Sequence, residues 1–145
     1  MVYEQRSAKG LAIEGITALV ILAALLFLFS TSFWISIPPN SKFQVGDIVV
    51  VLLTVLYIQR SEQLIPPLSA VASLALHVDV KKTSGIFYGF LRFLSIVVAY
   101  FSLRRTSLSF LTVFLDQNNS QILYDAFFTT LILLHVYSTV KRLVH

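Results

Sequence analysis

The chain has 145 residues, of which 57% are hydrophobic and only 12% are charged, and its mean hydropathy is +0.82. Charged residues make up about a quarter of an ordinary globular domain, so this composition excludes a soluble fold and leaves room for a single domain. The lack of cysteine excludes disulfides and thiolate sites, and the net charge of +4 comes from Lys and Arg scattered beside apolar segments, a pattern typical of membrane topology rather than nucleic-acid binding.

The first apolar stretch runs from Leu11 to Ile37 and is long enough to cross a bilayer, which takes about 20 residues of helix. The polar tail before it contains Arg6 and Lys9, so the segment has the general form of a secretory signal. A signal core has only about 7 to 15 apolar residues, however, and this stretch is longer. We therefore predict an uncleaved transmembrane helix, which ends at Pro38-Pro39.

The second stretch, Val45 to Ile65, is rich in β-branched residues that would favour a strand in water. In lipid, a lone strand would leave its backbone polar groups unpaired, so we expect a helix. The polar run from Gln59 to Gln63 is expected at the membrane surface, and Pro66-Pro67 is expected to end the helix.

The segment from Leu68 to Val78 is too short to cross the membrane, since a helix rises only about 1.5 Å per residue. Its polar residues Ser69, Ser73 and His77 recur every four residues, and Lys81 continues the stripe. This spacing predicts an amphipathic helix whose polar face is in contact with water. We expect a short interfacial helix that lies along the membrane or is tucked against the bundle.

Two further apolar stretches, Gly85 to Leu103 and Gln121 to Val140, complete the set of predicted spans. Each has a tyrosine near both ends, suited to the two aromatic belts of a membrane: Tyr88 and Tyr100 in the first, Tyr124 and Tyr137 in the second. Between the two spans, Thr106 to Leu115 is too short to cross and is expected to be a surface segment or a helical extension.

Together these elements predict an all-α integral membrane protein with four transmembrane helices plus a short interfacial amphipathic helix, in one bundle domain over residues 1–145. Lys and Arg favour cytoplasmic loops. With a cytoplasmic N-terminus, seven lie inside and three outside: Arg6, Lys9, Arg60, Lys81, Lys82, Lys141 and Arg142 against Lys42, Arg104 and Arg105. A fifth span over Leu64 to Val80 would divide them five against five, so we favour four spans with both termini cytoplasmic, and we expect the plasma membrane.

Ionisable groups within the spans are the best functional clues, because charge in hydrocarbon is costly and usually faces a partner or water. Glu14, Arg92 and His135 are expected at similar depths, within about 5 to 10 Å of the inner surface on their helices. They form a candidate intramembrane polar cluster. We interpret it as a buried, ion-paired cluster that orients helices; the alternatives are a proton or ion path, and snorkelling or contact with a partner subunit.

A second group of charges is expected at the outer membrane surface. Asp47 and Asp125 lie near the predicted N-terminal ends of their helices, where the helix dipole favours acidic groups. Their depth also matches that of Arg104 and Arg105. We therefore predict outer ion pairs among these four residues.

No catalytic, metal or nucleotide signature occurs in the sequence. His77 and His135 could suggest haem or copper, but no histidine or carboxylate spacing supports a metal site. No serine-histidine-acid arrangement, P-loop, dinucleotide fingerprint or HExxH motif occurs either. We therefore expect no enzyme activity, no catalytic residue, no metal and no cofactor.

The expected function is that of a non-catalytic integral membrane subunit that packs against larger subunits of a multi-subunit complex. The alternative is a small homo-oligomeric channel or transporter, with Glu14, Arg92 and His135 along its polar path. The expected partners are the lipid bilayer and either other membrane subunits or further copies of this chain. Nucleic acid is not among them.

Overall fold

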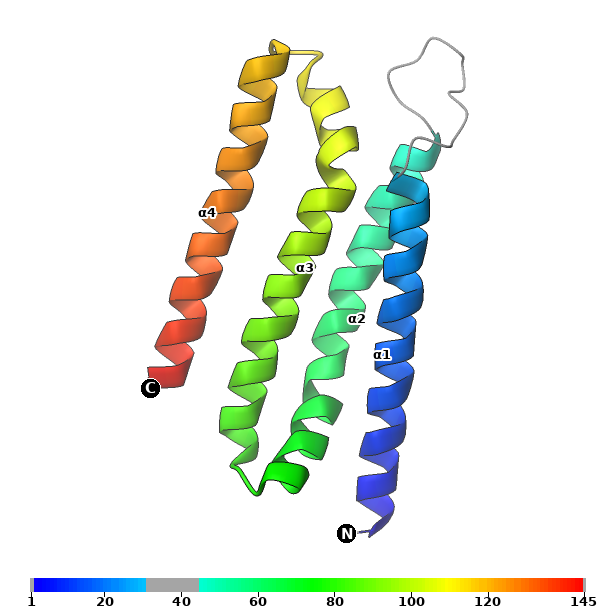
Figure 1. Ribbon diagram of the computed structural model, residues 1–145, viewed down its shortest axis with the longest axis vertical. Coiled ribbons are helices and arrows are strands. Elements are labelled where there is room, and N and C mark those ends of the chain that lie inside the picture. Colours follow the sequence, from blue (N-terminus) through cyan, green and yellow to red (C-terminus); the bar gives the residue numbers. More distant parts are fainter. Residues whose placement is uncertain (1, 31–44, 145) are drawn as a thin grey trace.

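The chain folds into four long helices in a computed structural model that describes residues 2–30 and 45–144 (Figure 1). The helices are α1 (Val2–Ser30), α2 (Val45–Leu76), α3 (Val80–Leu111) and α4 (Gln117–Val144). Each is long and apolar enough to cross a membrane, and the described ranges contain no strand. The prediction of an all-α integral membrane protein with four membrane-length helices is confirmed.

The four helices lie side by side in an open row, with both chain ends toward the same end of the molecule (Figure 1). Helix α2 packs against α1 and α3, and α1 also touches α3. Helix α4 packs against α3 alone among the described helices. The row therefore does not close into a ring, and one side of α3 is left between α2 and α4.

Two separate clusters of buried side chains follow from this arrangement. The larger cluster joins α1, α2 and the middle of α3, and its fully enclosed members include Leu26, Val50 and Leu64. The smaller cluster lies between α3 and α4 and contains Ala99, Tyr124 and Phe128. The attachment of α4 thus depends on a small core of its own.

The expected separate helix at Leu68 to Val78 is not present, because these residues mostly continue α2, and Pro66-Pro67 lies inside that helix. Our prediction that the prolines end the helix was wrong, and residues 64–76 do not turn back as a fifth span. A proline removes one backbone hydrogen bond and crowds the preceding turn. Burial of Leu64 and Ile65 beside the prolines supports the helix across that defect.

The serine stripe on this part of α2 faces the protein interior instead of water. Ser69 and Ser73 are buried, and each hydroxyl donates to a backbone carbonyl of its own helix, that of Ser69 to Ile65 at 2.6 Å. A small side chain that satisfies its hydroxyl in this way lets a neighbouring helix approach closely. The periodicity was read correctly, but in this surrounding it marks a packing face.

The turn between α2 and α3 is closed by local hydrogen bonds. His77 has a positive φ of 53°, and the Val78 N–H donates to the Ser73 carbonyl at 3.3 Å, the pattern of a Schellman cap. Asp79 then caps α3 by accepting a hydrogen bond from the Lys81 N–H at 3.0 Å. His77 is therefore the left-handed residue of the cap that ends α2.

The remaining boundaries follow the predicted spans with extensions. Helix α1 begins before Leu11, and residues 31–37 and Pro38-Pro39 lie outside the described residues. Helix α3 continues to Leu111, so residues 106–111 form the helical extension that was one of the two expectations. The four helices exceed the thickness of hydrocarbon, which a helix of about 20 residues crosses.

Candidate functional site

A groove of about 470 Å³ lies over α3, between α2 and α4. It exists because α4 contacts α3 and does not reach α2. Its polar lining residues lie toward one end of the groove: Glu62 from α2, Arg92 and Ser95 from α3, and His135 and Ser138 from α4. Its other end is apolar, with residues such as Leu103 and Phe127. All the residues that line the groove belong to candidate membrane spans.

His135 is the buried group of the groove, with 8% of its surface exposed. Its Nε2 lies 2.9 Å from the Gly89 carbonyl oxygen on α3. Because a carbonyl oxygen only accepts, Nε2 carries the proton and donates, and in the neutral ring Nδ1 is then the acceptor. His135 therefore ties α4 to the backbone of α3.

A glycine makes this backbone contact possible. A Cβ atom added at Gly89 would lie 2.6 Å from Cγ2 of Thr139, much closer than normal packing allows. The hydroxyl of Thr139 also lies 3.4 Å from His135 Nε2. Gly85 and Gly89 are four residues apart, the spacing that allows close helix approach in membranes, and this signal would have identified the contact from the sequence.

Two arginines meet at one tyrosine ring near the polar end of the groove. The guanidinium carbon of Arg92 lies 5.3 Å from the centroid of the Tyr88 ring, and Arg92 also donates to the Tyr88 hydroxyl. The guanidinium carbon of Arg142, from α4, lies 4.0 Å from the same centroid. Both distances are within the range of cation–π attraction. From the sequence, Tyr88 was expected in an aromatic belt, and Arg142 was used only as one of the basic residues that indicate the cytoplasmic side.

The floor of the groove carries a hydrogen bond between helices. The Ser61 and Ser95 hydroxyl oxygens lie 2.6 Å apart, joining α2 to α3. Glu62, the next residue on α2, is exposed and lines the groove. In the part of the chain that the structure describes, no salt bridge involves Glu62 or Arg92.

The predicted cluster of Glu14, Arg92 and His135 is assembled only in part. Arg92 and His135 line the same groove, but Glu14 does not. Glu14 is exposed on α1, which packs against α2 and α3 and does not touch α4. Depth estimates place residues at a level of the membrane but not around the helix axis, so they could not exclude Glu14. The carboxylate in the groove is Glu62, which we had placed at the membrane surface.

Of the predicted outer charges, Arg104 and Asp125 are connected through a tyrosine hydroxyl. Arg104 donates to the Tyr100 hydroxyl at 3.2 Å, and that hydroxyl donates to Asp125 at 2.8 Å. The hydroxyl of Tyr124 donates to the Tyr100 carbonyl at 2.5 Å. One tyrosine thus connects the predicted cation and anion across α3 and α4.

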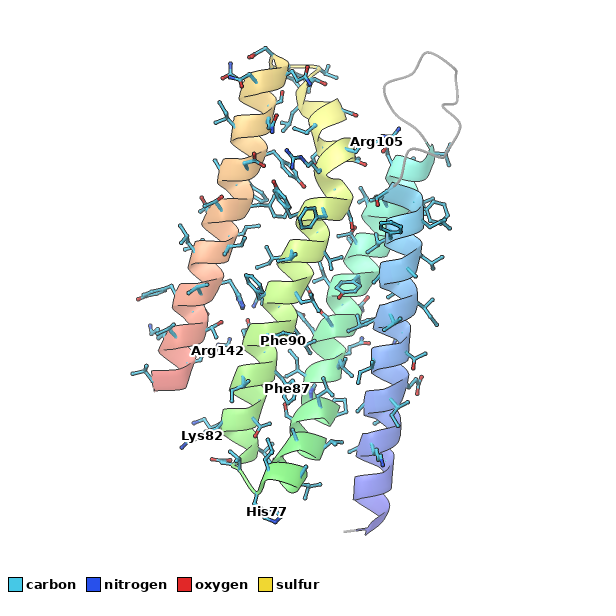
Figure 2. The ribbon with its side chains drawn as sticks, in the orientation of Figure 1. His77, Lys82, Phe87, Phe90, Arg105 and Arg142 are labelled. Carbon is cyan, nitrogen blue, oxygen red and sulfur yellow. The ribbon has the colours of Figure 1, made fainter. Side chains whose placement is uncertain are left out.

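Asp47 and Arg105 lie near the contact between the N-terminal end of α2 and the C-terminal half of α3. Asp47 is buried, with 7% of its surface exposed, and it accepts a hydrogen bond from the Thr106 hydroxyl at 2.8 Å. Figure 2 shows Arg105, the neighbour of Thr106, beside the N-terminal end of α2. One partner of Asp47 is therefore Thr106, the residue that follows the two predicted arginines.

A search of protein families, of curated proteins and of solved structures found no match to this chain. The residues that the structure describes contain no group of three or more potential metal ligands. Functional interpretation therefore depends on the groove. The polar end of the groove offers one carboxylate, one guanidinium and an imidazole within the membrane spans, a set suited to binding a polar group or exchanging protons.

Proposed function

We propose that this chain is a non-catalytic integral membrane subunit that binds other subunits of a membrane complex through the groove between α2 and α4. The observation that carries the proposal is the position of Glu62 and Arg92, which line an open groove within the spans and form no salt bridge in the described part of the chain. A charged side chain within the hydrocarbon of a bilayer is costly, and the cost rises to about 2.5 to 3.5 kcal/mol at the centre. A helix that enters the groove removes these groups from lipid and supplies polar partners.

The row of helices supports the same interpretation. A closed bundle directs its polar side chains inward, whereas this row leaves one side of α3 uncovered. The apolar end of the groove, with Ile96 and Leu131, offers a packing surface next to the charged end. An apolar surface beside a small number of polar anchors is the usual composition of an interface between membrane helices.

A photo-crosslinking amino acid at Leu134 tests this proposal against a neighbouring control at Leu133. The two leucines are similarly exposed, at 60% and 64%, but only Leu134 lines the groove. In native membranes we expect Leu134 to crosslink to a different polypeptide and Leu133 to crosslink mainly to lipid. Equal crosslinking at both positions, or none to protein at Leu134, would contradict the proposal.

A homo-oligomeric channel or transporter is the second candidate, and one feature of α2 favours it. Pro66 and Pro67 lack N–H groups, so the carbonyls of Glu62 and Gln63 receive no backbone hydrogen bond from the next turn. Free carbonyls beside a carboxylate resemble the broken helices that bind ions in transporters. In this case Leu134 crosslinks to a second copy of the chain, and the purified protein conducts ions in liposomes.

We further propose that both termini are cytoplasmic and that the protein is located in the plasma membrane. The support for the orientation is the excess of Lys and Arg at the ends of the helices near the termini and at residues 81–82. A reporter fused after His145 and an impermeant label at residue 118 are expected on opposite sides. Membrane fractionation checks the compartment.

A further inference from the structure

A concentration of positive charge lies where α3 and α4 end near the chain termini. Arg142 and Lys141 are in the last turn of α4, and Lys81 and Lys82 are in the first turn of α3. Figure 2 shows Lys82 on the side of α3 that faces α4, beyond the end of α4. A basic cluster beside the end of a membrane span is typical of contact with anionic lipid.

The innermost part of this cluster is the pair of arginines at Tyr88. Two guanidinium groups from different helices lie 5.3 Å and 4.0 Å from the centroid of one ring. Both guanidinium groups are attracted to the same ring, which gathers two like charges at one place, and like charges repel. Within residues 2–30 and 45–144, neither arginine forms an ion pair.

We infer that Arg92 and Arg142 bind the phosphate of an anionic phospholipid at this end of the groove. Guanidinium groups match phosphate oxygens with paired hydrogen bonds, and two of them facing one anion cancel the repulsion between them. The Tyr88 ring holds both groups in place before the lipid arrives, which reduces the entropy lost on binding. Lys82 and Lys141 then attract the charge of the headgroup.

The inference does not require the partner subunit of the proposed function, because the binding groups all belong to this chain. Lipid binding can therefore be observed even if Leu134 crosslinks to no other protein. Crosslinking at Leu134 can likewise be observed even if the chain shows no lipid preference. The inference does require that the membrane surface lie near the level of Arg142, as the tyrosine and the lysines at this end indicate.

Native mass spectrometry of the purified chain with added phosphatidylglycerol or phosphatidylcholine tests this site. We expect the unmodified chain to retain phosphatidylglycerol in preference to phosphatidylcholine. Each basic residue near an anionic surface contributes about fivefold to binding, so the double variant Arg92→Gln/Arg142→Gln is expected to bind phosphatidylglycerol about 25-fold more weakly. Unchanged retention in this variant would overturn the inference.

Two further variants separate loss of the site from loss of the fold. Arg60→Gln removes one exposed arginine from α2, whose bonding partner among the described residues is Gln63, and should leave lipid preference unchanged. The double lysine variant of Arg92 and Arg142 keeps the charge but loses the paired hydrogen bonds, so it is expected to bind phosphatidylglycerol more weakly than the unmodified chain and more tightly than the double glutamine variant. A lysine variant that binds as tightly as the unmodified chain, or an unmodified chain that binds both lipids equally, would contradict the inference.

Discussion

Helix α3 meets its neighbours in different ways in its C-terminal and N-terminal halves, which we call the outer and inner halves after the proposed orientation. In the outer half, Arg104 and Asp125 share the hydroxyl of Tyr100, and Asp47 accepts a hydrogen bond from Thr106. In the inner half, about 18 Å further along the helix, Arg92 and Glu62 face a groove and form no salt bridge in the described ranges.

This difference indicates which charges support the fold and which are available for other molecules. The outer groups use side chains of the same chain, so they hold α2, α3 and α4 together. The inner charges lie at the surface of a groove, and the hydrogen bonds that join the helices there are those of His135 with the backbone of Gly89 and of Ser61 with Ser95. Removing outer charges should therefore reduce stability, while removing inner charges should mainly reduce binding.

The largest expected effect comes from comparing two acidic residues of α2. Asp47→Ala removes the acceptor of Thr106 and should lower the free energy of unfolding by about 1.5 to 3 kcal/mol, since hydrogen bonds to charged groups contribute that much. Glu62→Ala, at an exposed position, should change it little. Thermal unfolding in detergent, followed by circular dichroism, measures both. Equal losses would remove the distinction between the two halves.

The second effect concerns the close contact between Gly89 on α3 and Thr139 on α4. Gly89→Ala should destabilise the protein by about 1 to 2 kcal/mol, because the added methyl group collides with Thr139. Gly10→Ala is the control, since nothing lies within 4 Å of that position, and it should be neutral or slightly stabilising because alanine favours helix. The same unfolding assay applies. If the two variants behave alike, α4 does not pack on α3 as described.

The third effect tests the floor of the groove. Ser61→Ala removes the hydrogen bond to Ser95 and should cost about 0.6 kcal/mol, the average for hydrogen bonds between membrane helices. Thr130→Ala is the control, because the Thr130 hydroxyl is exposed and donates only within its own helix, to Ala126. A loss from Thr130→Ala as large as that from Ser61→Ala would mean that the serine contact joins no helices.

The smallest expected effect is the interaction free energy between substitutions of Glu14 and Arg92, which should be close to zero. Glu14 and Arg92 belong to the cluster predicted from depth, but Glu14 lies outside the groove. The effects of Glu14→Leu and Arg92→Leu on unfolding should therefore add within about 0.5 kcal/mol in the double variant. A larger coupling would show that the two side chains meet and would restore the predicted cluster.

The sequence was sufficient to predict the four helices because hydropathy and length decide whether a segment crosses a membrane. It was not sufficient at Pro66-Pro67, where side-chain burial preserves a helix that local rules end. The prediction that Ser69 and Ser73 face water failed for a related reason. Periodicity identifies a face, but only the neighbouring helix decides whether that face meets water or protein.

The candidate site shows the same limit. Arg92 and His135 were identified because ionisable residues in a span are costly and rarely accidental. Glu62 was missed, because a polar run beside prolines has the appearance of a membrane surface. The position of α4 decided the outcome, and the sequence alone did not reveal that α4 contacts only α3.

The packing order of the helices also has a consequence for biosynthesis. Helix α2 packs on α1, α3 packs mainly on α2, and α4 packs on α3 alone. Each helix therefore finds its main partner already in the membrane when it leaves the ribosome, and contacts between neighbours in sequence form quickly. The shared core of the first three helices does not need α4. Docking of α4 on α3 is then the step that creates the groove, so the binding surface appears only after all four helices are inserted.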